Sequence, residues 1–468
     1  MNILKKLLGY SLPTIIGFAI SFISTPIITR LFPPVEIGKI NLFVTYLNLF
    51  MLIAFAGMDQ AFVRFFRELP NRYNKKELFT VSLLSSLINC FLISGFIILF
   101  YNFFSSEISG NTNIIICFLL VVSLICNVIL KFLNTISRVQ DDILMYSVQS
   151  ISVTFISKIL FVIVALWNPS FFNAIIVLTL GYFIATVFFV LIKKDTFNLP
   201  NYWDGKSVKS LALFGLPLMP VTLLSWLNIS LPQFMLKNYV DFSAIGIYTS
   251  ALAIAGTISI VQAGFTIYWN PFVYKNYKIN QNLIKQIHSL LTFFICIVAF
   301  VIIFSQDYLY LLLGEKYRIS QIFFPFLIIA PMCFTISEST GIGIGISKKT
   351  YLNIISFLVS VVVNIIFSLI LIPYFEMAGA AFSSAISALI LVSLKTFLGE
   401  KYYQVISSKT KTFGSIMCVF VAAIFNYIFF EELFIKNMLF IILFLGLVFL
   451  NRKDIKEILL KLKKRKEV

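Results

Sequence analysis

Fourteen apolar stretches, each about long enough to cross a bilayer, occupy nearly all of this 468-residue chain. The hydrocarbon core of a membrane is about 30 Å thick and needs roughly 20 helical residues to span it. Lipid offers no hydrogen-bond partners to backbone groups, so such stretches must form helices. Only 12% of the residues are charged, whereas a soluble domain has about 25%. The sequence therefore predicts an all-α polytopic membrane protein.

The last two predicted spans are the shortest, and the others run to between 20 and 30 residues or so. The predicted spans are Leu7–Leu31, Ile37–Val63, Leu78–Phe100, Asn113–Ser137, Ile143–Trp167, Phe171–Ile192, Ser210–Leu236, Ser243–Val273, Ile287–Leu313, Ile319–Ser347, Tyr351–Tyr374, Ala378–Leu398, Phe413–Phe430 and Phe434–Leu450.

The loops between these spans alternate in basic charge, and most of the 37 lysines and arginines fall on one side. Positively charged loops stay in the cytoplasm, so both termini are predicted to be cytoplasmic. The net charge of +17 is then mainly a topology signal. The basic segment Asn451–Val468 is predicted to anchor on anionic membrane lipids.

The second half of the chain repeats, in the same order, short motifs of the first half. Leu12-Pro13 opens the first span and Leu216-Pro217 opens the seventh, while Ile37-Gly38 corresponds to Ile245-Gly246. Six spans per repeat give both halves the same orientation, and transporters of this kind bind substrate between their halves. The sequence predicts an N-terminal lobe at residues 1–200, a C-terminal lobe at residues 201–400, and two further helices with a basic tail at residues 401–468.

Prolines at matching positions predict bends in the first and seventh spans. A proline removes a backbone hydrogen bond, and interrupted helices in corresponding positions point to a transporter's binding region. An alternative is that these bends only shape the bundle. The prolines are Pro13, Pro26, Pro217, Pro220 and Pro232.

Ionisable residues inside spans are costly and are functional candidates by default. Arg30, Lys131 and Lys158 make the first half rich in cations, and a cavity lined by all three would attract a pyrophosphate or acidic sugars. Arg30 and Lys131 have the alternative of reaching the membrane interface, whereas Lys158 lies too deep. Asp59 and Glu338 are candidates for coupling to Na⁺ or H⁺.

Structural interpretations of these acidic residues remain open. Asp59 lies five residues before Arg64, with which it could form an ion pair. Glu338 lies in a glycine-rich stretch whose glycines could simply allow close helix packing. The lone His288 is expected to be structural or solvated, and the acidic pair Asp141 and Asp142 is expected to form a solvated turn beside Arg138.

Three segments resemble the oligosaccharide flippase family of the multidrug/oligosaccharidyl-lipid/polysaccharide (MOP) exporter superfamily. They are Thr29–Gly38, Gly57–Phe66 and Leu371–Ala381. The third is the most specific, although it has Glu376 where the family usually has glycine. The resemblance implies two six-helix bundles in a V-shaped, MATE-like arrangement, with two peripheral C-terminal helices.

The same resemblance implies a function. The protein would move a polyprenyl-pyrophosphate-linked oligosaccharide from the cytoplasmic to the outer leaflet of a bacterial inner membrane, for O-antigen or capsule assembly. Its partners would be the lipid-linked oligosaccharide and other polysaccharide-assembly proteins, with no nucleic acid.

Two rival functions are weighed against this one. A cation-coupled multidrug exporter of the same superfamily would be expected to carry cavity carboxylates and usually twelve helices. A membrane glycosyltransferase or polysaccharide polymerase would need an acidic first outward loop or a large outward loop, and the first such loop, Phe32–Glu36, has one carboxylate. We expect no enzyme activity and no cofactor. We also expect no metal site, since the six cysteines lie singly within apolar spans.

Overall fold

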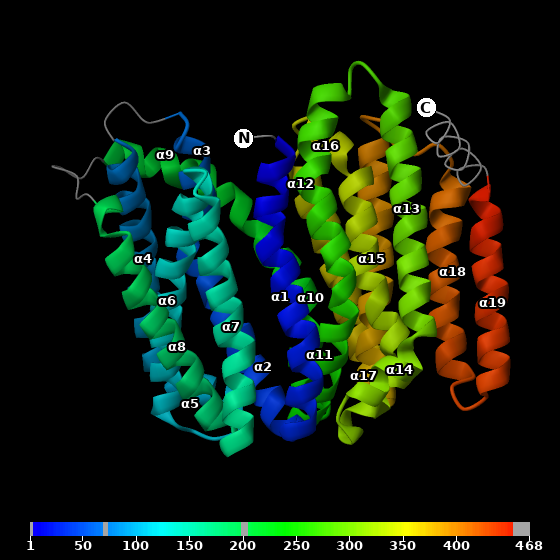
Figure 1. Ribbon diagram of the computed structural model, residues 1–468, viewed down its shortest axis with the longest axis horizontal. Coiled ribbons are helices and arrows are strands. Elements are labelled where there is room, and N and C mark those ends of the chain that lie inside the picture. Colours follow the sequence, from blue (N-terminus) through cyan, green and yellow to red (C-terminus); the bar gives the residue numbers. More distant parts are fainter. Residues whose placement is uncertain (1–2, 69–73, 198–204, 453–468) are drawn as a thin grey trace. The chain divides into compact units, whose positions relative to one another are not determined.

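The computed structural model describes residues 3–68, 74–197 and 205–452, and all the regular elements among them are helices (Figure 1). Thirteen helices in this part of the chain are long and apolar enough to cross a membrane. One of them, α17 (Tyr351–Glu400), consists of two helices that meet at Glu376, where the backbone has φ 48° and ψ −122°. Counting its two arms separately gives the fourteen predicted crossings. The all-helical prediction is confirmed.

The described chain divides into two compact units. Unit 1 comprises Met1–Gln233 and Asp241–Gly246, and unit 2 comprises Phe234–Val240 and Ile247–Val468. The predicted division into lobes at residues 200 and 400 stays a prediction, and the basic tail beyond residue 452 lies outside the described residues.

Unit 1 contains the first six spans and the start of the seventh. Its elements are α1 (Ile3–Leu31), α2 (Pro34–Phe55), α3 (Met58–Phe65), α4 (Lys75–Leu99), α5 (Tyr101–Ser109), α6 (Ile114–Val139), α7 (Ile143–Trp167), α8 (Phe171–Ile192), η1 (Lys194–Thr196), α9 (Gly205–Gly215), η2 (Leu216–Leu218) and the first part of α10 (Met219–Tyr239).

The second predicted span is shorter than expected because the helix breaks at Ala56 and Gly57. Both residues have positive φ, 46° and 76°, which is a conformation that glycine adopts without strain. A Cβ on Gly57 would lie 2.2 Å from the carbonyl oxygen of Gly215. The break therefore lets α3 turn away from α2 and pack backbone to backbone against the end of α9.

The prolines act differently in the two corresponding spans. α1 is one helix that contains both Pro13 and Pro26, and the bends predicted at these two prolines stay a prediction. Side-chain hydroxyls near the proline bond to the helix backbone, as when Thr25 Oγ1 donates to the carbonyl of Ser21 at 2.7 Å. Such bonds help a membrane helix to accommodate a proline.

The seventh span changes from an α-helix to a 3₁₀ helix near its start. Pro217 lies in the short 3₁₀ helix η2, between α9 and α10. Pro220 is the second residue of α10, and Pro232 lies inside α10.

Unit 2 contains the remaining spans. Its elements are the end of α10, α11 (Phe242–Ala255) from Ile247 onward, η3 (Gly256–Ile258), α12 (Ser259–Asn276), α13 (Gln281–Phe304), α14 (Gln306–Leu312), η4 (Glu315–Ile322), α15 (Phe324–Thr340), α16 (Ile342–Ile346), α17, α18 (Lys409–Ile428) and α19 (Leu433–Leu450).

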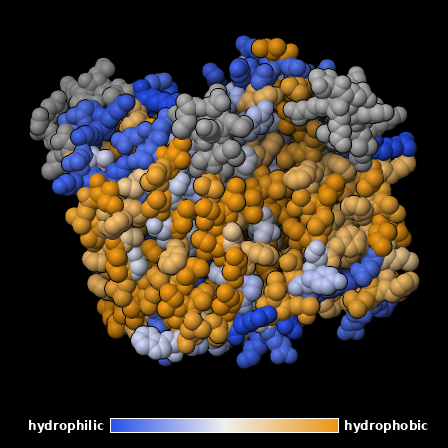
Figure 2. Space-filling view, in the orientation of Figure 1, coloured by the Kyte–Doolittle hydropathy of each residue, from blue (hydrophilic) through white to orange (hydrophobic). Residues whose placement is uncertain are grey.

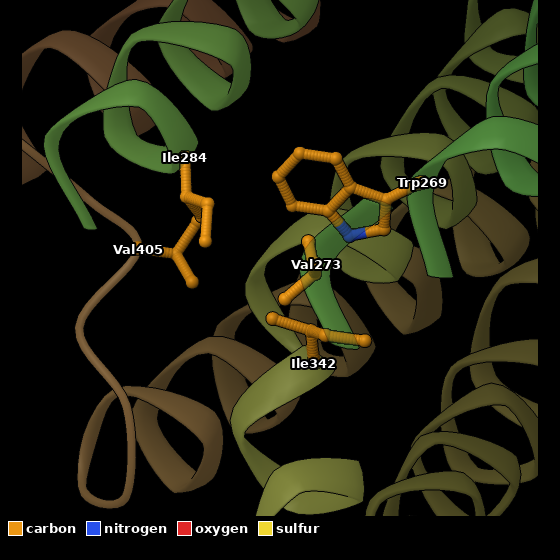
Figure 3. Packing of buried hydrophobic residues seen from close by; sticks show 5 residues of the cluster. All are labelled: Trp269, Val273, Ile284, Ile342 and Val405. Atoms are coloured by element: carbon orange, nitrogen blue, oxygen red, sulfur yellow. The ribbon is translucent and has the colours of Figure 1, made fainter. Parts of the chain in front are cut away.

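Buried aliphatic side chains around Trp269 hold the ends of several unit 2 helices together. Trp269 and Val273 of α12 pack with Ile284 of α13, Ile342 of α16 and Val405, which precedes α18 (Figure 3). All five are at most 6% exposed. Burial of apolar surface at about 25 cal/mol per Å² makes this cluster an anchor for segments that are distant in sequence.

His288 is buried in unit 2 and bonded at both ring nitrogens. Nδ1 lies 2.8 Å from Ser339 Oγ of α15, and Nε2 lies 3.1 Å from Thr412 Oγ1 of α18. The side chain therefore ties three helices together, which fits the structural interpretation and rules out the solvated one.

The surface separates by polarity in each unit. On the face that Figure 2 shows, hydrophobic side chains cover the flanks of the helices, and hydrophilic ones gather at the helix ends. A membrane-spanning protein needs this pattern, because lipid meets the flanks and water meets the ends.

Candidate functional site

α1 and α7 lie side by side in unit 1 and run in the same direction (Figure 1). Near their first ends, the rings of Tyr10 and Tyr146 are 5.5 Å apart, edge to face. Two turns further on, a Cβ on Gly17 would lie 3.4 Å from Thr154 Oγ1. Residues on α1 thus face residues on α7 in step along the pair.

A cavity of about 310 Å³ opens between these two helices. Five of its eight lining residues carry hydroxyl groups, and two are aromatic. Hydroxyl groups both donate and accept hydrogen bonds, so this cavity suits a ligand rich in polar groups. The lining residues are Pro13, Thr14, Gly17, Phe18, Ser21, Tyr146, Ser150 and Thr154.

Lys158 continues the polar side of α7 by one turn. Tyr146, Ser150, Thr154 and Lys158 are each four residues apart, so they lie on one face of the helix. Gly17 of α1 faces Thr154 of α7, so Lys158, four residues further along α7, is level with Ser21, the last cavity residue of α1. Lys158 is half-buried, and within the described chain no carboxylate acts on its charge. Lys158 therefore follows the last cavity residue of α7, Thr154, by one helical turn on the same face.

α6 adds a second polar face beside α7. Asn127, Lys131, Asn134 and Arg138 follow helical spacing, and Asn134 Nδ2 donates to Ser150 Oγ at 3.0 Å and to the carbonyl of Tyr146 at 3.1 Å. These bonds place the polar face of α6 against that of α7.

Lys131 lies one turn from Asn134 on this polar face of α6 and is exposed. It interacts electrostatically with Asp59 of α3 and with Arg138. The carboxylate of Asp59 therefore partly compensates the positive charge of Lys131, whereas no carboxylate does so for Lys158 within the described chain.

Arg30 does not join Lys131 and Lys158. It is exposed and lies nine residues beyond Ser21, which is about 900° of helical rotation, or two and a half turns. This spacing puts Arg30 on the side of α1 opposite the cavity. The structure thus brings two of the three predicted cations to one region of unit 1.

The two predicted ion-coupling carboxylates belong to different units. Asp59 is half-buried in unit 1, and Arg64, its predicted partner, pairs instead with Glu68 at 2.7 Å. Glu338 of α15 is half-buried in unit 2, where it interacts electrostatically with the buried Lys395 of α17. Each carboxylate therefore faces a lysine inside its own unit.

The acidic pair at the α6–α7 turn has defined partners. Tyr10 Oη donates to Asp141 Oδ1 at 3.0 Å. Asp142 accepts from the backbone N–H of Met145 and pairs with Lys193 at 2.8 Å.

Burial opposes ionisation of Asp142, but these two partners outweigh it and hold its pKa below the ordinary value. The acidic pair joins α1, α7 and the end of α8, and it does so in a turn where Asp141 is exposed and Asp142 is partly exposed, as expected. In the part of the chain described, no group of three or more His, Cys, Asp and Glu side chains could hold a metal ion.

The sequence reasoning missed the hydroxyl-lined cavity and the role of Asn134. The four-residue spacing from Tyr146 to Lys158 was visible and could have revealed the polar face of α7. The facing residues of α1 could not have been found this way, because their pairing with α7 spans more than a hundred residues.

Comparisons with known proteins agree with this architecture. The sequence profile of a family described as "Polysaccharide biosynthesis protein" matches residues 3–275. A comparison with curated protein sequences gives no match. Among solved structures, the inward closed conformation of the lipid II flippase MurJ is similar, with a TM-score of 0.66 and 14% identity, covering 95% of this chain and 99% of that one.

Two multidrug transporter structures are also similar. A mutant of a MATE transporter from Vibrio cholerae gives a TM-score of 0.62 at 13% identity, covering 85% of this chain and 96% of that one. An inward-facing multidrug resistance MATE family transporter of the MOP superfamily gives 0.56 at 16% identity, covering 85% and 97%. At these identities the likeness concerns the fold, which is of the MATE and MurJ type.

Proposed function

The chain belongs to the polysaccharide biosynthesis protein family, and from this premise we propose that it is a flippase for a polyprenyl-pyrophosphate-linked oligosaccharide. It carries this glycolipid from the cytoplasmic to the outer leaflet by alternating access, for assembly of a surface polysaccharide such as O-antigen or capsule. The MurJ-like fold supports a lipid-linked substrate, because the name of that protein identifies it as a lipid flippase.

The observation that carries the proposal is the position of Lys158 on α7, one turn beyond Thr154 and on the same face as the hydroxyl-lined cavity. A sugar offers hydroxyls that pair with Thr14, Ser21 and Thr154 along the cavity. A pyrophosphate offers oxygens that accept charge-assisted hydrogen bonds from lysine. A cation without a carboxylate partner inside a span matches a ligand that brings its own negative charge.

The charge of this region argues against a carrier of cationic drugs. α1, α6 and α7 contain no Asp or Glu between their ends, while α6 and α7 together carry Lys131, Arg138 and Lys158. Like charges repel, so a cationic drug would gain little in this cavity. Asp59 and Glu338 remain the candidates for coupling to H⁺ or Na⁺.

The remaining parts of the proposal concern its cellular setting. We place the protein in the bacterial cytoplasmic membrane with both termini in the cytoplasm, where anionic lipids hold its basic segments. Its transport partners are the lipid-linked oligosaccharide and the polysaccharide-assembly proteins that make and use it.

Deleting the gene and locating the lipid-linked repeat unit tests the function. We expect the glycolipid to accumulate in the inner leaflet, where an impermeant sugar oxidant cannot label it, and the wild-type gene to restore labelling. Normal surface glycan together with new drug sensitivity would reject the flippase and favour the multidrug exporter. Loss of the complete repeat unit itself would favour a glycosyltransferase.

A further inference from the structure

A second cavity, of about 250 Å³, lies in unit 2 where α15, α17 and α18 meet. Its walls include Phe326, Leu371, Phe382 and Ile428, and the half-buried Tyr427. Phe326 and Phe382 pack edge to face at 5.1 Å, which gives the cavity a rigid aromatic wall.

Hydrocarbon is the ligand that fits these walls. A water molecule needs two to four polar partners, and genuinely apolar cavities stay dry; one of about 150 Å³ takes up benzene. The cavity of unit 2 is larger and is built from helices that qualify as membrane spans. The alkyl chain of a surrounding membrane lipid is therefore the expected occupant of the cavity.

A strained acidic residue directly follows one of the residues that line the cavity. Phe375 lines the cavity, and the next residue, Glu376, is exposed at the break in α17 with φ 48°. A non-glycine residue in such a conformation costs about 1–3 kcal/mol and is found mostly at functional positions. Glycine would avoid this cost, so we expect the carboxylate of Glu376 to have a role that glycine could not fill.

Two more carboxylates follow the end of α18, whose residues Ile424, Tyr427 and Ile428 also line the cavity. Glu431 and Glu432 are exposed and come shortly after the lining residue Ile428. The N–H of Glu432 donates to the carbonyl of Phe429 at 3.2 Å, so the turn stays close to the helix end. The carboxylates of Glu376, Glu431 and Glu432 are called the acidic rim below. The nearby Lys436 is 1% exposed, pairs with Asp307 at 3.7 Å and lies over the ring of Phe430 at 5.3 Å, so its ammonium group is buried against these other partners.

We propose that the cavity is a binding site for a membrane phospholipid with an amine headgroup, whose acyl chain fills the apolar space while its ammonium group lies against Glu376, Glu431 and Glu432. The acidic rim attracts an ammonium group and repels a bare phosphate or pyrophosphate. The site therefore disfavours the polyprenyl-linked cargo and anionic phospholipids. The amine-headgroup phospholipid is instead a lipid that stays bound to the protein and is not transported.

Native mass spectrometry of the purified full-length protein tests this site directly. The protein is mixed with equal concentrations of phosphatidylethanolamine, phosphatidylglycerol or polyprenyl phosphate, and the bound fraction is measured for each. We expect phosphatidylethanolamine to be retained best. Ala378→Trp fills the cavity from one of its lining positions and should weaken that binding about tenfold. The control Ile370→Trp, at an exposed position outside the lining, should leave it unchanged.

A second variant separates the headgroup from the chain and does not depend on filling the cavity. Replacing Glu376, Glu431 and Glu432 with Gln should abolish the preference for phosphatidylethanolamine over phosphatidylglycerol, whereas Glu315→Gln, an exposed carboxylate away from the lining, should retain it. Equal binding to wild type and Ala378→Trp, or preferential binding of phosphatidylglycerol or polyprenyl phosphate to the wild type, would overturn the proposal. Neither readout requires transport.

Discussion

Gly38 and Gly246, the glycines of the two repeated Ile-Gly pairs, pack against each other within unit 1. A Cβ on Gly38 would lie 1.9 Å from the carbonyl oxygen of Phe242, and a Cβ on Gly246 would lie 2.0 Å from the carbonyl oxygen of Pro34. The contact is reciprocal, because each glycine meets the backbone at the start of the other helix. The sequence repeat thus has a physical basis in this close approach.

This contact predicts that Gly38→Ala is destabilising. Backbone atoms cannot move aside as a flexible side chain can, and overpacking costs about 1–3 kcal/mol. We expect a lower melting temperature in detergent or nanodiscs. Gly264→Ala is the matched control, since nothing lies within 4 Å of its added Cβ, and it should be neutral or slightly stabilising. Equal melting temperatures for the two variants would contradict the observed packing.

Lys158→Ala should lower transport by about 10- to 100-fold at normal protein levels, because a hydrogen bond to a charged group contributes roughly 1.5–3 kcal/mol. Lys158→Arg should keep part of the activity, since it retains the charge. Lys316→Ala, an exposed lysine in η4, serves as the control and should transport normally. The measurement is outer-leaflet labelling of the glycolipid in complemented cells. Full activity of Lys158→Ala would remove this residue from the site.

Thr154→Val should weaken transport while preserving the fold. The substitution keeps the shape of the side chain but removes a hydroxyl that lines the cavity, and a lost hydrogen bond costs about 1 kcal/mol, or roughly fivefold in affinity. Thr154→Ser keeps the hydroxyl and should behave like the wild type. The comparison requires transport rates over a range of glycolipid concentrations in proteoliposomes. A loss of activity in the serine variant as large as that in the valine variant would assign the effect to packing.

The ion pair between Asp142 and Lys193 predicts a dependence of stability on pH. The pKa of Asp142 is lower in the folded protein than in the unfolded one, so its contribution is present above the unfolded pKa and is lost as the pH falls through the folded pKa. We expect the melting temperature to fall on acidification below pH 4 or so, and Asp142→Asn to flatten that part of the curve. Unchanged acid sensitivity in the variant would show that other carboxylates dominate.

Glu376→Gly should raise the thermal stability, because glycine removes the cost of a positive φ, which is about 1–3 kcal/mol. Glu376→Ala is the informative control, since it removes the carboxylate and keeps the strained backbone. We expect a higher melting temperature for the glycine variant and little change for the alanine variant. An equal gain in both would mean that the carboxylate, and not the backbone, is unfavourable.

Most helix positions could be predicted from hydropathy, because lipid demands long apolar helices. The predicted spans Ile143–Trp167 and Phe171–Ile192 coincide with α7 and α8. The breaks at Ala56–Gly57 and at Gly256–Ile258 were missed. Hydropathy indicates which segments are buried in the membrane. It cannot show where the helix backbone breaks within such a segment, because the side chains remain apolar through the break.

The candidate site was predicted only in part, because its residues come together through long-range packing. Lys158 was found as an isolated charge in a span, but the cavity residues Thr14 and Ser21 that face α7 lie on a helix far away in sequence. The interaction between Asp59 and Lys131 could not be predicted for the same reason. Arg64 lies nearer to Asp59 in sequence and was therefore expected to be its partner. Local spacing identifies the face of one helix, whereas the partner helix is fixed only by the fold.

The binding of both His288 ring nitrogens by hydroxyl groups has a consequence for energy coupling. This is the chain's single histidine, and its imidazole is occupied as a crosslink among three helices. A transport cycle driven by protons would then lack the one side chain that ordinarily changes charge between pH 5 and 8. Coupling to protons would then depend on carboxylates such as Asp59 and Glu338, and not on an imidazole.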